Sequence, residues 1–243
     1  MDEDRGRDDQ RAFLDLHCHS SASFDSLSRP ADLVRVAAVR GLTHLAITDH
    51  DRIDGALRAR DAAPPGLTVI VGEEILTREG DCLGLFLERP VPAGRPLLET
   101  LDAIHAQGGL AGLPHPFDGL RRSSLAGESE AFLEGIVSRL DFIEGFNARV
   151  LRPAANERAA DFARRYRISA VASSDAHSLP EVAIACTIVR GPCGTPGQLR
   201  DALGDATLVP GRASYYLRGL TPVAKLLNRL RGQGRPPPAS SSE

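Results

Sequence analysis

The chain has 243 residues, of which 42% are hydrophobic, 25% charged and 5% aromatic. This length suits one large α/β domain or two small ones, and the apolar residues are sufficient for a sizeable core. The formal net charge of −3 excludes the broad basic surface that long nucleic-acid contacts need, so no binding to duplex nucleic acid is expected.

The cysteines and the two ends of the chain indicate the compartment. The four cysteines stand at irregular, distant positions, which matches neither a CxxC zinc site nor a dense disulfide framework. Residues 1–10 lack the apolar segment of a signal peptide, and no run approaches about 18 continuous apolar residues. We therefore expect a soluble, cytoplasmic protein with no membrane partner. Residues 1–10 are charged and 232–243 are rich in Pro, Ser and Gly, so both are predicted to be disordered tails around a single domain at 11–231.

Short apolar runs alternate with helical segments between these tails. Strands are predicted at 12–16, 43–48, 67–71, 83–87, 110–113, 142–146, 169–172 and 183–189. Helices are predicted at 30–40, 53–61, 96–107, 132–138, 154–166 and 195–203. Several of the strands are continuously apolar, which is typical of a largely parallel sheet covered by helices. In such α/β folds function collects at the carboxyl ends of the strands.

The first chemically loaded motif is Asp-Leu-His-Cys-His-Ser at 15–20. Alternate side chains of a strand share a face, so His17 and His19 lie about 7 Å apart along it and can hold one metal ion. Cys18 points to the opposite face, where a thiol packs like an apolar residue. A His-x-His pair also occurs in structural and surface positions, so its recurrence elsewhere decides the interpretation.

Metal-type residues follow five of the predicted strands in succession. They are His17, His19 and Asp25; Asp49, His50 and Asp51; Glu73 and Glu74; His115; and Asp175 and His177. Asp49 or Asp175 could instead cap the next helix, and His115 could belong to a simple turn. Five coincidences at one topological position favour a metal centre. The two other histidines, His44 and His105, fall within a strand and a helix and are expected to be structural.

This residue set indicates the metal and the reaction. Imidazole and carboxylate ligands without cysteine suit Zn, Mn or Fe and argue against a closed structural zinc site. About eight ligands exceed the needs of one ion, so two or three divalent ions sharing a carboxylate are expected. Such clusters generate hydroxide at neutral pH and stabilise the attacking and leaving oxygens of a phosphoester. Hydrolysis is the predicted reaction.

Five motifs in one order carry a family resemblance: Asp-Leu-His-Cys-His-Ser, Ile-Thr-Asp-His-Asp, Val-Gly-Glu-Glu-Ile, Leu-Pro-His-Pro-Phe and Ser-Ser-Asp-Ala-His. In these motifs, spanning 15–177, the sequence resembles the PHP domain, the polymerase and histidinol phosphatase superfamily of metal-dependent phosphoesterases. The resemblance implies a distorted (β/α)7 barrel with a two- or three-metal centre at the carboxyl ends of the strands. It implies three sets of ligands: His17, His19, Glu74 and Asp175 for a first metal; Asp25, His50 and His177 for a second; Glu74, as a bridge, and His115 for a third.

The third set contains a departure from the family pattern. Asp81 stands three residues before Gly84, where many members place a His. Asp81 could ligate the third ion, although its charge and reach differ from those of imidazole, or it could be an ordinary turn residue. Cys82 beside it should face away. Glu73 occupies a position that is usually apolar in the family, so the bridge is assigned to Glu74.

Phosphate binding is assigned to Arg121, Arg122 and Arg149, since arginine binds phosphate through two donors, although each could simply be solvated. We predict hydrolysis of a small phosphomonoester by a metal-bound hydroxide. The predicted catalytic residues are Asp175, His177 and Asp51. Asp175 is placed at the metal, and solvent, His177 or Asp51 protonates the leaving oxygen.

Two alternatives remain open. One is a 5′→3′ exonuclease or nucleotide phosphatase acting on short oligonucleotides or bisphosphonucleotides. It needs an aromatic stacking platform, for which Phe117 and Phe146 are the candidates. The other is a non-catalytic metal-binding interaction module, which the nearly complete ligand set disfavours. The expected partner is thus a small phosphorylated substrate or a short oligonucleotide, and the oligomeric state is not indicated.

Overall fold

The structure is a computed structural model that describes residues 11–234. The tail predicted at 1–10 and residues 235–243 of the tail predicted at 232–243 lie outside the described residues. The strands are β1 (Arg11–Asp15), β2 (His44–Ile47), β3 (Thr68–Leu76), β4 (Asp81–Leu85), β5 (Leu110–Leu113), β6 (Phe142–Asn147), β7 (Ser169–Ser173), β8 (Cys186–Arg190) and β9 (Thr207–Val209). The helices are α1 (Pro30–Val39), α2 (Asp54–Asp61), α3 (Leu97–His105), α4 (Glu130–Ile136), α5 (Pro153–Tyr166), α6 (Pro196–Ala202), α7 (Tyr215–Arg218) and α8 (Leu220–Leu230).

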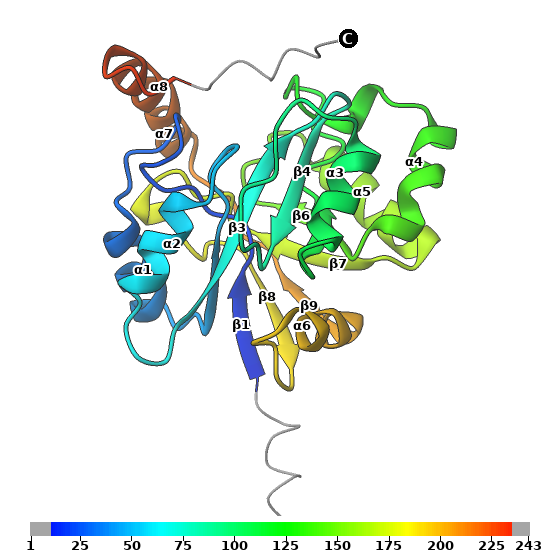
Figure 1. Ribbon diagram of the computed structural model, residues 1–243, viewed down its shortest axis with the longest axis horizontal. Helices are drawn as coiled ribbons and strands as arrows, with labels where there is room; N and C mark the ends of the chain where they lie inside the picture. Colours follow the sequence, from blue (N-terminus) through cyan, green and yellow to red (C-terminus); the bar gives the residue numbers. More distant parts are fainter. Residues whose placement is uncertain (1–10, 235–243) are drawn as a thin grey trace, which may run out of the picture.

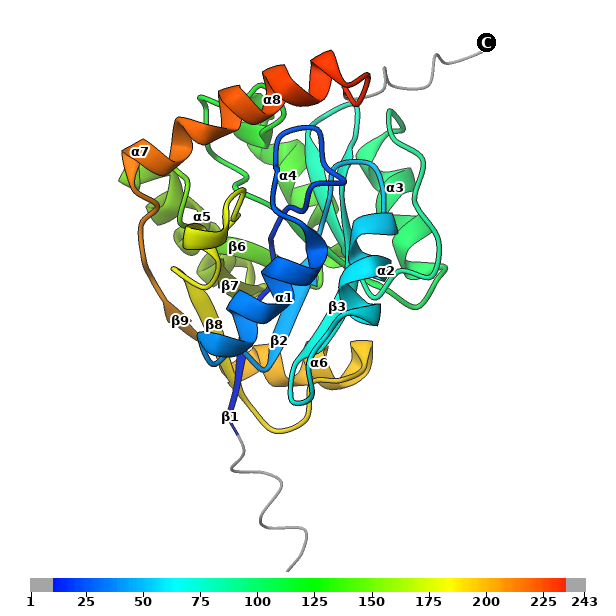
Figure 2. The same ribbon diagram turned by 90° about the vertical axis from the view of Figure 1, so that its left-hand side faces the viewer.

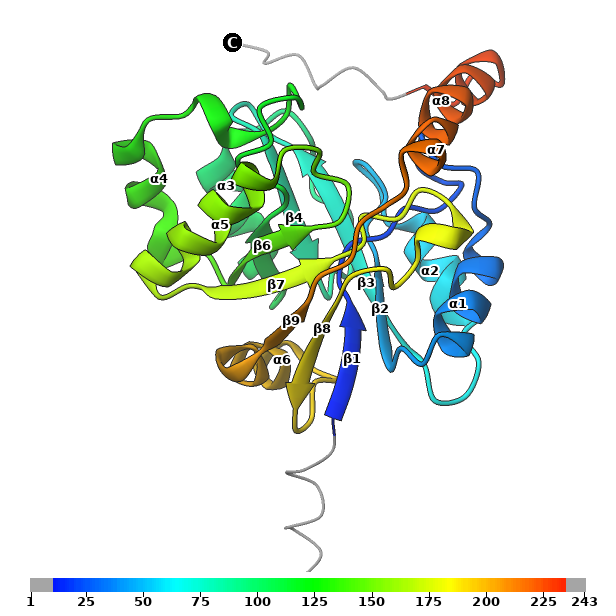
Figure 3. The ribbon, with the colours of Figure 1, turned by 180° about the vertical axis from the view of Figure 1, so that it is seen from behind.

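Within the described residues the strands form one nine-stranded sheet in the order β7-β6-β5-β4-β3-β2-β1-β8-β9. β1, β2 and β3 are parallel, as are β5, β6 and β7, whereas β4 runs antiparallel to both of its neighbours. β8 and β9 continue the sheet beyond β1 as antiparallel strands. The sheet curls into a nearly closed barrel, with β7 coming round toward β8 and β9 (Figures 1 and 3).

Side chains close the seam of the barrel between β7 and β8. Thr187 on β8 accepts a hydrogen bond from the backbone N–H of Ala172 at 2.8 Å and donates to its carbonyl at 2.9 Å. At the end of β1, Asp15 accepts from the N–H groups of Ser174 at 3.0 Å and Ala183 at 2.9 Å. Burial raises the pKa of Asp15 to about 6. The first strand is therefore tied to the last part of the barrel.

The helices cover the barrel from several sides. α1 and α2 lie on one flank, and α3, α4 and α5 lie on the opposite flank (Figure 1). α1 buries Leu33, Val34 and Ala37 and begins with Pro30, whose fixed φ suits the first helical turn. α6 lies at the amino end of the barrel, while α7 and α8 lie across the carboxyl ends of the strands (Figure 2). In the described part of the chain no helix is long and apolar enough to cross a membrane.

The predicted α/β barrel is confirmed, but the predicted count of seven strand–helix repeats is not. β3 continues to Leu76 rather than ending at 71, because its second half pairs with antiparallel β4. Glu73 and Glu74 therefore lie within β3, not after it. For the same reason β4 begins at Asp81, two residues before the predicted strand. The segments β9, α7 and α8 were not predicted.

Candidate metal centre

The predicted ligands converge at the carboxyl end of the barrel. Within the described residues, four overlapping groups have ligand atoms within 4.8 Å of one another: His19, Asp25, His50 and His177; His17, His115 and Asp175; His17, His19 and Glu74; and Glu74, Asp81 and His115. All nine side chains are buried or nearly so. The strand ends thus bring together residues that are distant in sequence.

The innermost group is formed by His17, His19, Glu74 and Asp175. The two imidazole Nε2 atoms are 3.0 Å apart, and each lies 3.2 Å from Glu74 Oε2. Asp175 Oδ1 lies 3.6 Å from His17 Nε2 and 3.4 Å from His19 Nε2. Each imidazole Nε2 atom therefore lies within 3.6 Å of the other Nε2 and of two carboxylate oxygens.

The spacing of these donors fits a divalent ion. Bond lengths of about 2.0–2.1 Å around a tetrahedral zinc ion place neighbouring ligand atoms about 3.3–3.4 Å apart, close to the separations of this group. Asp175 Oδ1 is buried and accepts no hydrogen bond, which is costly unless a cation is nearby. The spacing of these side chains and the unsatisfied oxygen of Asp175 therefore fit a bound metal ion.

Glu144 on β6, which the sequence analysis did not single out, orients this group. Its Oε1 accepts from His17 Nδ1 at 2.9 Å, so Nδ1 keeps its proton and Nε2 is directed at the other members of the group. Its Oε2 accepts from the backbone N–H of His115 at 2.7 Å and from Asn147 Nδ2 at 2.9 Å. A carboxylate in the middle of the apolar run Phe-Ile-Glu-Gly-Phe was the signal that could have revealed it.

The electrostatics of the innermost group favour positive charge. Burial alone would lower the pKa of His17, but the carboxylates of Glu144, Asp175 and Glu74 outweigh it and raise this pKa well above its ordinary value. Burial likewise opposes ionisation of Asp175, yet Arg121 and His17 hold its pKa well below the usual range. The field that retains a proton on imidazole also attracts a metal ion, so metal binding must displace protons.

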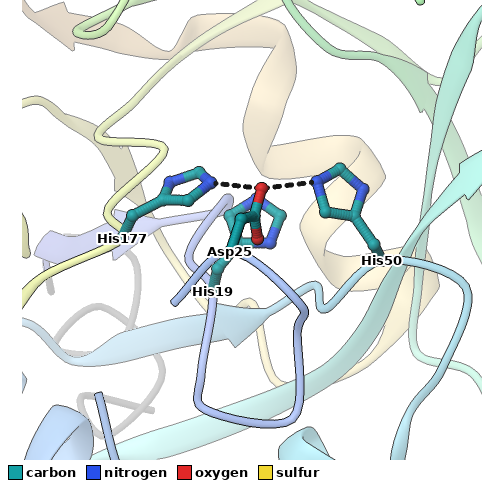
Figure 4. Close-up of side chains that lie close together, drawn as sticks. All are labelled: His19, Asp25, His50 and His177. Atoms are coloured by element: carbon teal, nitrogen blue, oxygen red, sulfur yellow. Dashed lines mark hydrogen bonds and ion pairs between the residues drawn. The ribbon is translucent and has the colours of Figure 1, made fainter. Parts of the chain in front are cut away.

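A second group surrounds Asp25, which follows β1. Asp25 Oδ2 lies 3.1 Å from His177 Nε2 and 3.3 Å from His50 Nε2, with His19 behind it (Figure 4). His177 Nδ1 donates to the carbonyl of Asp175 at 2.8 Å, which directs Nε2 toward Asp25. His50 Nδ1 lies 3.3 Å from Glu74 Oε2, so the first two groups meet at Glu74.

The third group contains the departure from the family pattern. His115 Nε2 lies 2.9 Å from Glu74 Oε1, and Asp81 joins them from the first position of β4. Asp81 is therefore a strand residue and not a turn residue, and burial raises its pKa. Cys82 faces the hydrophobic core, as does Cys18.

A cavity of about 590 Å³ opens beside these groups. Its lining includes four members of these groups, Asp25, His50, Asp81 and His177, and five basic residues, Arg121, Arg122, Arg149, Arg218 and Lys225. Arg121 forms ion pairs with Asp175 and Asp118, and Arg149 Nη1 pairs with buried Glu181 at 2.6 Å. All three arginines predicted to bind phosphate thus reach this cavity.

Three other predicted residues lie elsewhere. Asp51 accepts from the N–H of Leu76 at 2.8 Å and lines a neighbouring cavity with His50. Phe117 packs in the core on Phe162, and Phe146 lines a pocket formed with α5, so neither borders the main cavity. The prediction of these two residues as the aromatic stacking platform was wrong, because Phe117 is buried in the core and Phe146 lies against α5. The aromatic residue that does line the cavity is Phe24, in the loop after β1.

Comparison with known families agrees with this geometry. The PHP domain family matches residues 15–161, and the PHP-associated family matches residues 153–208. The chain belongs to the PHP domain family. Its members are metal-dependent phosphoesterases, and the prediction of a hydrolase of this class is confirmed.

Two relatives show how far the PHP-family similarity extends. An uncharacterized protein of Methanocaldococcus jannaschii is 36% identical over 169 residues, covering 70% of this chain and 67% of that protein. A 5′-3′ exoribonuclease of Haemophilus influenzae is 36% identical over 120 residues, covering 44% of this chain and 43% of that enzyme.

Solved structures share the PHP-like fold. A two-domain protein of Bacteroides vulgatus, containing a predicted PHP-like metal-dependent phosphoesterase, superposes with a TM-score of 0.70 at 19% identity. The match covers 84% of this chain and 66% of that one. Endonuclease Q of Pyrococcus furiosus has a TM-score of 0.62 at 18% identity, covering 82% and 58% of the two chains. Endonuclease Q has also been solved with a 27-mer duplex substrate.

Proposed function

We propose that this PHP-family protein hydrolyses a small phosphomonoester with the help of two or three divalent ions of the Mn, Zn or Fe type. The observation that carries the proposal is the inner group, in which two imidazole nitrogens lie within 3.6 Å of the carboxylates of Glu74 and Asp175. Beside it is a cavity of about 590 Å³ whose lining includes five basic residues. A cavity of this size accommodates a small phosphorylated molecule. The cytoplasmic location stays a prediction.

We assign the first ion to His17, His19, Glu74 and Asp175 and the second to Asp25, His50 and His177. The third would use Glu74, His115 and Asp81. When bound, the ions supply Lewis-acid activation of water and of the phosphoryl group. Glu144 and the carbonyl of Asp175 fix the imidazoles of His17 and His177 with Nε2 inward. The protein therefore contributes a pre-oriented donor set.

The arginines are proposed to bind and orient the phosphate. Arg121 is tied to Asp175 and Asp118, and Arg149 to Glu181, so both guanidinium groups are held at the cavity wall before substrate arrives. Pre-oriented donors lose little entropy when they bind an anion. Arg122 is exposed and completes the basic side of the cavity.

Protonation of the leaving oxygen is assigned first to solvent, because both ring nitrogens of His177 are already used: Nδ1 donates to the carbonyl of Asp175, and Nε2 is assigned to the second ion. His177 lines the cavity and could donate a proton only when its Nε2 is not bound to that ion. Asp51 is the weaker candidate, since its carboxylate is engaged with the backbone of β3 and borders the neighbouring cavity.

Removal of a terminal nucleotide from a short single strand is the second candidate function. The similarity to the Haemophilus influenzae exoribonuclease favours it, as does Phe24, whose aromatic ring borders the cavity and could stack on a base. The earlier expectation that no duplex nucleic acid binds is without support, since endonuclease Q binds a duplex on the same type of fold.

A substrate screen on metal-loaded protein tests both candidates. Protein loaded with Mn or Zn is assayed against phosphorylated metabolites, 5′-phosphorylated oligonucleotides and abasic duplex DNA, and its metal content is measured by elemental analysis. We expect two to three equivalents of metal and fastest release of phosphate from a small phosphomonoester. Preferential release of mononucleotides would select the second candidate, and one equivalent of metal or none would contradict the site.

A further inference from the structure

The helices α7 and α8 lie beyond both family matches, which end at residues 161 and 208. They cross the carboxyl end of the barrel, directly over the loop that follows β1 (Figure 2). Thr221, Pro222 and Lys225 from α8, together with Arg218, line the main cavity. One wall of the site is therefore built by a segment to which the family similarity assigns no role.

Asn228 anchors α8 on the loop that presents Asp25. Its side chain is 2% exposed, and Nδ2 donates to the carbonyl groups of Ser23, Phe24 and Ser26 at 3.3, 3.1 and 3.1 Å. Three backbone carbonyls converging on one amide fix the helix relative to this loop.

A second anchor ties the segment to the loop after β6. Arg149 Nη2 donates to Thr221 Oγ1 at 2.8 Å, and Arg218 Nη2 donates to the carbonyl of Ala148 at 3.0 Å. The segment is thus held at both sides of the cavity, and its position there is part of the fold.

Lys225 is the residue that this wall offers to a ligand. Its side chain is 50% exposed, and Nζ lies 4.0 Å from Asp25 Oδ2 and 5.2 Å from the centre of the Phe24 ring. An ion pair at this distance and exposure is weak, so an entering anion can compete for the ammonium group. Lys225 is also the one lysine among the 29 basic residues of the sequence, the others all being arginine.

We propose that α8 is a specificity-determining wall of the site and that Lys225 binds a second anionic group of the substrate, separate from the phosphoester that is cleaved. The inference rests on the proposed phosphoesterase function. Arg121, Arg122 and Arg149 lie together on other loops of the cavity and suit the scissile group, whereas Lys225 reaches in from α8. The second group is a phosphate or a phosphodiester, carried by a small molecule or by a short oligonucleotide.

Kinetics with matched substrates test the selectivity. Propane-1,3-diol monophosphate is compared with its bisphosphate, and thymidine 5′-monophosphate with the 5′-phosphorylated thymidine dinucleotide. Lys225→Gln should raise KM about tenfold for the substrate of a pair that carries the additional phosphate, with kcat nearly unchanged. KM for the other substrate of that pair should stay the same. Lys225→Arg should restore the low KM. The pair that responds identifies the source of the second group.

Arg229→Gln is the matched control, because it removes one positive charge from an exposed residue one turn further along the same helix, outside the cavity lining. Arg229→Gln should leave KM unchanged for both substrates of each pair. Equal effects of Lys225→Gln on both members of each pair, or an equal effect of Arg229→Gln, would overturn the proposal.

Binding can be followed without turnover, because reductive methylation with ¹³C-formaldehyde labels only Lys225 and the terminal amine and keeps the positive charge. In zinc-loaded protein, propane-1,3-diylbisphosphonate should shift the dimethyl-lysine NMR signal at concentrations about tenfold lower than propylphosphonate does. Identical titrations would contradict the role of Lys225. A selective shift in a protein that hydrolyses no phosphoester would reject the proposed function and keep the anion site.

Discussion

The histidines at the two ends of the barrel differ in how they are partnered. At the amino end, His44 meets Cys193 at 3.4 Å, and His105 meets Asp141 at 2.9 Å. At the carboxyl end one carboxylate serves several imidazoles, since Glu74 lies within 3.3 Å of a nitrogen of His17, His19, His50 and His115. Isolated pairs fix local structure, whereas the shared carboxylates create a region of negative charge that attracts further cations.

This difference predicts which histidines matter for catalysis. His17→Ala should reduce phosphoester hydrolysis to background and lower the metal content, because it removes one of the four residues assigned to the first ion. His105→Ala, the control, should keep activity within about threefold and cost at most about 1 kcal/mol of stability, since its partly exposed pair with Asp141 is a weak one. Rates and elemental analysis on folded variants check both. Wild-type turnover in His17→Ala would reject the assignment of the first metal.

Glu144 tests whether orientation of an imidazole contributes separately from ligation. Glu144→Gln can still accept one hydrogen bond but removes the charge beside His17, so metal affinity should fall about 10- to 100-fold. Glu134→Gln is the control, because Glu134 is a surface residue that contacts Tyr166. Calorimetric titration with zinc measures the difference. Unchanged affinity in Glu144→Gln would show that the innermost group orients itself.

Asp81 tests whether a third ion binds at the carboxyl end. Asp81→Asn should lower the metal content by one equivalent and reduce turnover, because the third group then loses a charged donor. Asp81→His should retain activity and shift the metal preference from manganese toward zinc, since imidazole is the softer ligand. Metal content and turnover rates are measured on both variants. If Asp81 binds no metal ion, both variants should match the wild type.

Glu73 and Glu74 are neighbours on β3 whose side chains point to opposite faces. Burial, only partly opposed by the Val91 N–H, raises the pKa of Glu73 from 4.5 to about 8. Between these values the unfolded chain releases this proton while the folded chain keeps it, so stability falls as pH rises through that window. Glu73→Gln removes the cost and should raise Tm on the order of 5 °C at pH 8, with little change at pH 4.5.

The exposed Glu88→Gln serves as the control for Glu73→Gln and should leave Tm unchanged at both pH values. Thermal unfolding followed by circular dichroism in the two buffers gives the comparison. A Tm for Glu73→Gln that is displaced equally at both pH values would show that burial does not govern the ionisation of Glu73.

The sequence allowed the metal ligands to be placed more accurately than the residues and strands around them. His17, His50 and Asp175 could be grouped because the carboxyl ends of parallel strands meet at one edge. Glu144 was missed because a carboxylate inside an apolar strand gains its meaning only from the imidazole that faces it across the barrel. The true length of β3 depends on pairing with β4, which no local pattern encodes.

The C-terminal segment was missed for a different reason. The leucines of α8 recur at helical spacing, but the partner of Asn228 is a loop some 200 residues earlier, at separations of 202 to 205 residues. Contacts of this range follow from the closed fold and not from any window of sequence.

The seam through Asp15 also sets an order of assembly. Asp15 and Ser174, which it joins, are 159 residues apart in the chain, and loop closure over such a distance is entropically costly and slow. During synthesis, His17, Glu74 and His115 leave the ribosome long before Asp175 does. The emerging chain therefore carries an incomplete set of ligands until β7 and β8 are made, and the tight binding of a metal ion is coupled to the last steps of folding.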